Sequence, residues 1–583
     1  MVSTRNRVQS YKKKMIYASA RTIFFLFFLA SLAYFLYLFN KFKYVIAINM
    51  KKHFSFSGLL VSGLVLVAMF MSSCGSKPSY KAAIPTDAPI VMEINMQSLT
   101  LKSNILSYKE LLADILVAGS DDGIIQKFAD ELRKADDGGM NFENPLYVFT
   151  DANMDNAFLL TAVKNRVEII DLMLSLPNRA IRAVEDEGAG VTWLEKDGKP
   201  MGVLTDELFI LGTANDRLQY ETLLACKGEF FATKMGKSMA SHAGDMTLMV
   251  NMPALNAQKS EELVGELVNN IAKQGKDISP MMLGNVFSAI RNLQLVANLK
   301  FLKGQIVLNV FAGDDEDHLM MKKIEPEVFA KVPAQHMIGM LAIGVDGSSM
   351  AEYVTKTVEN SGAALDNDTR VGLAMINSFI KQMDGTAAVA AYLNNEQPEV
   401  GVVGWLPMAK SRLNFLFKTL KDAIGFDLYL DGDKDFSTIS NMSKYRCVDY
   451  PVPFNMAEHA TSCYMYGYLD LNMLINKGLE IGRMRVRPSE IELYEAVAEV
   501  ANVIDYAEMK MEKYNEVSFI LTLADDSRNS LDLLIAKTFE LGISAYKYLQ
   551  TQQVNVWNSI MPEDNDDFDA QWDALETVEE VEW

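Results

Sequence analysis

Hydrophobic and polar residues alternate in several short runs, and the clearest of these runs occur twice along the chain. The run from Ile90 to Met96 follows Ile84-Pro85, and the run from Ile338 to Val345 follows Val332-Pro333. Alternation with a period of two is typical of a strand with one buried face. Each run therefore predicts a strand, and the residues after it predict a helix.

A hairpin followed by a helix is also predicted twice. The hairpin strands are apolar runs separated by a polar turn, and the helices have an amphipathic pattern. The expected elements are 147–151, 157–163 and 167–174 in the first copy, and 388–393, 400–405 and 413–417 in the second.

Two short sequence matches support one internal duplication. Met239–Ala243 is similar to Met456–Ala460, and residues 310–315 are similar to residues 521–526. The separation between matched segments falls from about 248 residues near the start to 217 and then 211. One duplication followed by net deletions in the second copy explains this trend.

We therefore predict an α+β protein made of two tandem copies of an antiparallel-sheet-plus-helices unit. The first repeat is expected at 84–330 and the second at 332–550, and each is long enough to form its own core. His242 and His459 occupy equivalent positions. This favours a shared structural role, such as a hydrogen bond where a strand begins, with ligand binding as the alternative.

The first 73 residues differ sharply from the rest of the chain. They contain ten Lys or Arg and no Asp or Glu, so the net charge changes from −20 for the whole chain to −30 for residues 74–583. Residues 50–73 have the parts of a bacterial lipoprotein signal peptide: a basic start, an apolar stretch and small residues before Cys74. The Met71–Gly75 segment resembles the lipobox of bacterial lipoproteins, which implies cleavage before Cys74 and a lipid on its thiol.

Residues 1–49 precede this signal and have two interpretations. The apolar run from Ile23 to Phe39 is an extra membrane segment, or it belongs to an upstream extension, with translation starting at Met50. Residues 74–83 are expected to form a short polar tether. Because two or three acyl chains hold a protein stably on a membrane, we predict a lipoprotein of the outer or inner membrane.

The lipobox at Cys74, the Ile84–Pro89 opening, Asn95 and Ser98-Leu99 together resemble an uncharacterised lipoprotein family of the Bacteroides group, domain-of-unknown-function family 4836. The resemblance implies an envelope location and a similar order of elements over most of 74–550, and it implies no activity. Surface-exported lipoproteins of this group often carry acidic residues after the Cys. The Gly75-Ser76-Lys77 found here favours a protein that faces the periplasm.

Composition narrows the class of protein. Apolar residues make up 49% and charged residues 22%, as in a folded globular chain. The net charge of −20 argues against a nucleic-acid partner. Four Cys exclude a disulfide-dense or multi-zinc scaffold, and Cys447 and Cys463 either form a disulfide or remain two buried thiols.

Residues that carry chemistry form no complete motif. No two His have the spacing and intervening Glu of a zinc hydrolase. Asp431–Asp435 begins like a calcium-binding loop, but Phe436 and Met442 stand where that loop needs Gly and Glu. Gly344–Ser349 lacks the nucleophile-elbow pattern and predicts a helix start capped by one of its serines. We expect no catalytic residue, metal ligand or cofactor.

Two charged segments have two interpretations each. Arg483, Arg485 and Arg487 form a solvent-facing basic cluster, or a site for an anion or a lipid headgroup. Residues 551–583 are an acidic C-terminal tail. Its last part, 563–583, has ten acidic and no basic residues and is either a solvated segment or a docking segment.

These observations favour a non-catalytic lipoprotein, anchored to a membrane through Cys74, that binds or scaffolds an envelope protein or glycan. The alternative is an envelope hydrolase whose carboxylates come together only in the fold, because such pairs leave no readable spacing. A deep pocket lined by two carboxylates would favour the hydrolase. A broad apolar groove between the repeats would favour the binding protein.

Overall fold

The structure is a computed structural model, and it describes most of the chain between residues 79 and 544. The described stretches are 79–104, 139–175, 181–255, 291–312, 320–333, 336–360, 367–393, 400–414, 428–441, 454–484 and 491–541, with short pieces at 258–262, 265, 417, 486 and 544. We call residues 79–312 the first half and residues 320–541 the second half. In these stretches, 18 strands form one large antiparallel sheet accompanied by 13 helices, which confirms the predicted α+β class.

The first half contains ten strands and seven helices within its described residues. In chain order they are η1 (Ser79–Ala83), β1 (Ile90–Ile94), α3 (Met96–Ser103), β2 (Leu146–Thr150), β3 (Ala157–Ala162), α6 (Arg166–Ser175), β4 (Ile181–Asp186), β5 (Val191–Lys196), β6 (Lys199–Leu204), β7 (Leu208–Gly212), α7 (Arg217–Leu224), η3 (Phe230–Ala232), α8 (Lys234–Ser241), β8 (Met246–Asn251), η4 (Met252–Ala254), β9 (Gln294–Leu302) and β10 (Gln305–Ala312).

The described residues of the second half form eight strands and six helices, besides the helical stretches 410–414 and 530–541. In chain order they are η5 (Pro326–Lys331), β11 (Met337–Val345), α11 (Gly347–Asn360), α12 (Asn367–Ile380), β12 (Gly385–Leu393), β13 (Val400–Leu406), β14 (Tyr429–Gly432), β15 (Ser437–Ser440), α14 (Phe454–Thr461), β16 (Met465–Asp470), α15 (Leu471–Arg483), α16 (Ile491–Ala501), β17 (Ile504–Lys513) and β18 (Glu516–Leu523).

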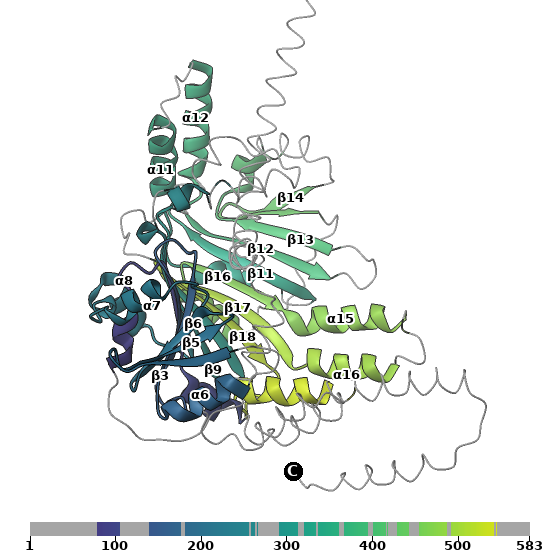
Figure 1. The fold of residues 1–583 in the computed structure, drawn as a ribbon. Helices are drawn as coiled ribbons and strands as arrows, with labels where there is room; N and C mark the ends of the chain where they lie inside the picture. Colours follow the sequence, from purple (N-terminus) through teal and green to yellow (C-terminus); the bar gives the residue numbers. More distant parts are fainter. Residues whose placement is uncertain are drawn as a thin grey trace, which may run out of the picture.

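The two halves share a single sheet, because β10 pairs with β18. From one edge to the other, the strand order is β4-β5-β6-β7-β3-β2-β1-β8-β9-β10-β18-β17-β16-β11-β12-β13-β15-β14. All of these pairs are antiparallel, and Figure 1 shows the first-half strands in blue beside the second-half strands in teal and green. The predicted hairpins at 147–163 and 388–405 correspond to β2–β3 and β12–β13.

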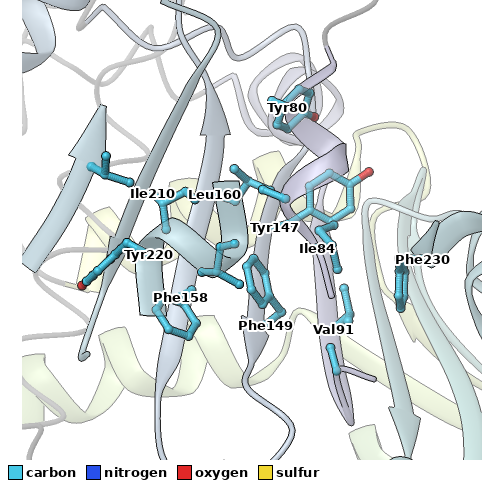
Figure 2. Packing of buried hydrophobic residues seen from close by; sticks show 14 of the residues in the cluster. Tyr80, Ile84, Val91, Tyr147, Phe149, Phe158, Leu160, Ile210, Tyr220 and Phe230 are labelled. Carbon is cyan, nitrogen blue, oxygen red and sulfur yellow. The ribbon is translucent and has the colours of Figure 1, made fainter. Parts of the chain in front are cut away.

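Each half has a hydrophobic core on the same face of the sheet. In the first half, aromatic side chains from β2 and β3 pack with Tyr220 of α7 and with Tyr80 of η1 (Figure 2). In the second half, Trp405 and Tyr466 pack against η5 and α14. The strand register places both cores on one face, since directly opposed residues point the same way. Neither of these two clusters contains residues of the other half.

Two predicted boundaries differ from the structure. Residues 79–83 were expected to lie in a polar tether, but they form the helix η1, whose Tyr80 is fully buried. The helix η5 begins at Pro326, and its Val328 and Phe329 belong to the second core. The expected bound at 330 therefore falls inside the helix η5. In both places a short helix buries its few apolar side chains in a core. The alternation of apolar and polar residues, which identifies strands, does not reveal such a helix.

Helices α3 and α11 begin in the same way. Asn95 accepts a hydrogen bond from the backbone N–H of Ser98 at 3.0 Å, and Asp346 accepts one from Ser349 at 2.9 Å. The hydroxyl of Ser349 also donates to Asp346, so the capping residue of α11 is Asp346 and the predicted serine cap is wrong. Backbone hydrogen bonds from Ser349 lower the pKa of Asp346 and keep it ionised at the helix N-terminus.

Within the described residues, no helix has the length and apolar character needed to cross a membrane. Residues 1–78, including the predicted signal peptide and Cys74, lie outside the described part of the chain. The same holds for the acidic tail, 551–583. The predictions made for these segments stay predictions.

Candidate functional site

A cavity of about 530 Å³ lies at one end of the first-half core. Three loops form its walls: the segment before β1, the turn between β2 and β3, and the end of α7 with the residues that follow. The lining residues are Ile84, Pro85, Thr86, Asp87, Asp151, Ala152, Asn153, Phe158, Gln219, Thr222, Leu223, Ala225, Cys226, Lys227 and Glu229. We call this cavity the loop pocket.

The first wall is fixed because η1 is locked into the core. Tyr80 donates a hydrogen bond to the carbonyl oxygen of Pro145 at 2.6 Å, and Ile84 is almost completely buried. The chain then turns through Asp87 into β1, where Val91 lies opposite Phe149 of β2. The pocket wall is therefore the exposed side of a segment whose other side is core.

A glycine joins the second wall to the first. Gly228 has φ of +76°, a left-handed conformation that side chains with a Cβ rarely adopt. Its N–H donates to the carbonyl oxygen of Ala82 in η1 at 3.1 Å. This bond brings Lys227 and Glu229, on either side of Gly228, to the rim of the pocket.

The third wall is the β2–β3 turn, and Asp151 holds its shape. One carboxylate oxygen of Asp151 accepts the backbone N–H of Asp155 at 2.9 Å, and the other accepts the side-chain amide of Asn156 at 2.8 Å. Phe158, on β3 just after the turn, lines the pocket and stacks on Phe149 with ring centroids 5.6 Å apart. The pocket thus joins an aromatic core residue to a polar rim.

The electrostatic character of the loop pocket is negative. Asp87, Asp151 and Glu229 line it with one Lys, and the C-terminus of α7 adds its partial negative charge. Burial, and then the charge of Asp87, raise the pKa of the half-buried Cys226 thiol. This thiol stays protonated at neutral pH and is a poor nucleophile. The pocket therefore suits binding of donors or cations better than thiol chemistry.

A second polar cluster surrounds Glu508 on β17. The Glu508 side chain is only 3% exposed and accepts hydrogen bonds from Tyr466 at 2.8 Å and from Nδ1 of His459 at 2.9 Å, while Lys510 lies 3.4 Å away. Burial, and then the charge of Glu508, raise the pKa of Tyr466. The neighbouring thiol of Cys463 donates to the His459 carbonyl and not to its ring. This geometry stabilises a buried carboxylate.

His242 and His459, which were expected to share a role, have different contacts. Nδ1 of His242 lies 2.8 Å from the carbonyl oxygen of Ser238, and its ring packs on Phe311 with centroids 3.8 Å apart. His459 instead pairs with Glu508. The backbone carbonyl of His242 accepts a hydrogen bond from Asn298 of β9, so a hydrogen bond near a strand is present in the first half.

The Asp431–Asp435 segment is the hairpin turn between β14 and β15. The pKa of Asp433 is lowered by hydrogen bonds from the backbone of Phe436 and then from Lys331. Asp431 accepts from Gly432 and from Lys410. Protein donors occupy these carboxylates, which favours the interpretation as a turn. Within the described chain, no group of three or more His, Cys, Asp or Glu side chains is placed to hold a metal ion.

The other candidate residues are only partly within the described chain. Cys463 is buried and carries a free thiol, which agrees with the second of its two interpretations, while Cys447 lies outside the described residues. Cys74, Arg485 and Arg487 also lie outside them. Arg483 is exposed on α15 and pairs with Glu495 of α16 at 3.1 Å.

The sequence indicated only one wall of the loop pocket. The Ile84–Pro89 opening was singled out as a motif, but the other two walls come from loops 64 and 142 residues further along the chain, counted from Asp87 to Asp151 and Glu229. A useful signal was Gly228, four residues after the end of helix α7, because a glycine just after a helix often marks a left-handed turn.

Comparisons of the chain with protein-family models, curated proteins and solved structures gave no match. The resemblance to the Bacteroides-group lipoprotein family therefore stays a prediction from Cys74 and the opening segment.

Proposed function

We propose that this protein is a membrane-anchored lipoprotein of the cell envelope. Its body is a duplicated, non-catalytic unit that binds a partner. The observation that carries the proposal is the position of the loop pocket. Its first wall, Ile84–Asp87, begins ten residues after Cys74, and η1 fixes that wall to the core. Ser79 is the fifth residue after Cys74, a reach of about 17 Å when extended. A lipid on Cys74 would keep the pocket close to the membrane surface.

The strand order supports the proposed duplication. Outward from the central pair, β10 is followed by β9, β8, β1, β2, β3, β7 and β6, and β18 is followed by β17, β16, β11, β12, β13, β15 and β14. In both series the strands occur in the same order along the chain. The two remaining strands, β4 and β5, have no counterpart in the described second half.

The register of the central pair supports the same conclusion. The β10–β18 ladder runs from Gln305 to Phe311 and is centred on Leu308, which lies opposite Phe519. These two residues are 211 apart, the same separation as between the similar segments 310–315 and 521–526. A pseudo-twofold axis through this pair would relate the halves, as expected for two fused copies of one unit.

Labelling tests the anchor. Cells that express the protein are fed an alkyne-bearing fatty acid, and the label is measured by in-gel fluorescence after fractionation. We expect Cys74→Ala to lose the label and to accumulate as an uncut precursor or in the soluble fraction. The matched control is Cys226→Ala, which keeps the label because its thiol lies in the loop pocket. A labelled, membrane-bound Cys74→Ala protein would refute the anchor.

A hydrolase is the second candidate, because three carboxylates line the loop pocket. Asp87 and Glu229 are the candidate acid and base, since both oxygens of Asp151 already hold the β2–β3 turn. Purified protein would be incubated with envelope glycans, and released reducing ends would be measured. Activity that disappears in Asp87→Asn and Glu229→Gln, and persists in the rim variant Gln219→Ala, would replace the binding proposal. Activity lost equally in all three variants would point to a damaged fold.

A further inference from the structure

Strand β4 lies at one edge of the sheet in the described part of the chain. Among the described strands it pairs only with β5, so the backbone groups on its other side have no strand partner there. The β4–β5 hairpin also extends the first half beyond the strands that have a counterpart in the described second half. An unpaired edge is a template for a further strand, and its side chains decide which strand can join it. We call residues 181–186 the β4 edge.

The β4 edge has an exposed apolar residue between charges of opposite sign. Arg182, Glu185 and Asp186 are exposed, and Val184 is 37% exposed. Successive side chains of a strand point to opposite faces, so Arg182, Val184 and Asp186 share one face. On the other face, Ile181 is buried and packs with helix α6. One face of the edge therefore carries Arg, Val and Asp in that order.

Both charged ends of this face can bind a further partner. On β5, Glu195 lies opposite Arg182 but is paired with Arg217 of α7. One carboxylate oxygen of Asp186 accepts the backbone N–H of Ala189 at 3.2 Å, which holds the side chain at the end of the strand. A carboxylate has about four acceptor sites, so Asp186 keeps the capacity to bind a guanidinium.

An antiparallel pair of two β4 strands related by a twofold axis has only a few registers. Directly opposed residues point to the same face, so the axis passes through one residue of each strand. An axis at Val184 places each Arg182 opposite the Asp186 of the other copy. An axis at Glu185 would place two carboxylates opposite each other. An axis at Ala183 would place Arg182 opposite Val184 and leave Asp186 without a partner.

We propose that the β4 edge pairs with the β4 edge of a second copy of this chain, in the antiparallel register centred on Val184. Two Arg–Asp pairs then flank one Val–Val pair, and cross-strand pairs of both kinds are favourable. The edge carries one basic and two acidic residues in a chain with a net charge of −20, so two copies do not attract each other at long range. The order of the charges, and not their sum, favours this partner.

Helix α6 adds apolar surface next to the edge. The twofold axis is perpendicular to the sheet, so both copies of α6 lie on the same face of the joined sheet. Val167 and Leu174 of α6 are 64% and 46% exposed and lie about two helical turns apart, on one side of the helix. A contact built on six strand residues and one helix side in each copy is small. We therefore expect single chains and dimers in equilibrium.

Disulfide trapping in the full chain tests the register. In Val184→Cys the two introduced thiols lie opposite each other across the axis, within the Cα separation of about 7 Å that a disulfide allows. Total lysate of expressing cells is oxidised with copper phenanthroline, and chains of doubled mass are measured on non-reducing gels. The unsubstituted chain gives the background. We expect Val184→Cys to form about five times more dimer than Leu101→Cys, a control on α3 at a side chain that is 74% exposed. Glu185→Cys, whose thiols are two residues out of register, should also form little dimer.

A charge swap tests the Arg–Asp pairs. In the Val184→Cys chain, Arg182→Glu places two carboxylates opposite each other and should lower the dimer yield about fivefold. Adding Asp186→Arg restores opposite charges across the axis and should return the yield to within about twofold of the starting value. Both variants carry the same change beside Glu195 of β5, so the recovery reports the contact between copies and not the fold.

Several outcomes would overturn the proposal. Equal trapping in Val184→Cys and Leu101→Cys would refute pairing at the β4 edge, and stronger trapping in Glu185→Cys would refute the register. A disulfide between Val184→Cys and a different protein would show that another chain occupies the edge. A charge-swapped chain that does not recover would refute the Arg–Asp pairs. Total lysate contains anchored and soluble chains alike, so these results do not depend on a lipid at Cys74.

Discussion

Asp245 offers a direct test of how the first half is held together. It lies between α8 and β8 and is only 3% exposed. Its carboxylate accepts hydrogen bonds from Ser98 at 2.5 Å, from Lys102 at 2.7 Å and from the backbone N–H of Phe301 at 2.6 Å. One buried carboxylate thus bonds to helix α3, which precedes Asp245 in the chain, and to strand β9, which follows it.

The loss in the free energy of unfolding on removing this carboxylate follows from the buried donors that it leaves without an acceptor. In Asp245→Ala the Phe301 N–H and the Ser98 hydroxyl lose their acceptor, at about 1 to 3 kcal/mol for each buried group. Breaking a fully buried ion pair costs about 3 to 5 kcal/mol. Lys102 is 28% exposed and recovers part of its hydration, so we discount the total to about 3 kcal/mol. Asp245→Asn keeps two acceptor contacts and should lose about half as much.

Urea unfolding of the full chain, followed by circular dichroism, measures this loss. The matched control is Asp155→Ala, which removes an ion pair to Lys259 from a carboxylate that is 59% exposed. We expect the control to change stability by less than about 0.5 kcal/mol. If Asp245→Ala unfolds within that same margin of the wild type, the carboxylate does not hold α3 and β9 together, and the reasoning fails.

Three further changes have defined outcomes. Asp87→Asn removes the charge that raises the Cys226 pKa, so alkylation of Cys226 at pH 8 should accelerate roughly twofold, measured by mass spectrometry of that peptide; slower alkylation would contradict this. Burial and then the charge of Asp470 raise the pKa of Asp505, so its ionisation costs stability as the pH rises above its unfolded pKa. Asp505→Asn should therefore stabilise the chain by about 0.5 kcal/mol at pH 7 and not at pH 3, and an equal effect at both values would refute the cause. Trp405→Ala empties a site that is 1% exposed and should cost about 4 kcal/mol in urea unfolding, whereas a loss below about 1 kcal/mol would show that the second core collapses around it.

The sequence predicted the local elements better than their partners. The alternating runs at 90–96 and 338–345 correspond to β1 and β11. The pairing of β10 with β18 was not predicted, since alternation gives the faces of a strand and not its neighbours. The loop pocket was missed for a related reason: Asp87, Asp151 and Glu229 meet only when three loops converge.

The β10–β18 pair connects the two halves, and its side-chain contacts explain why the sheet has one register there. On the face that carries both cores, Asn309 donates to Asn298 at 2.9 Å and accepts from Ser518 at 2.7 Å, forming a polar chain across β9, β10 and β18. On the other face, Leu308 lies opposite Phe519. A slip of one residue would move Asn309 to the face of Leu308 and Phe519 and leave its amide without these partners, which destabilises the slipped register. The halves are therefore held in a fixed relation, so that a lipid at Cys74 would orient the second half as well as the loop pocket of the first.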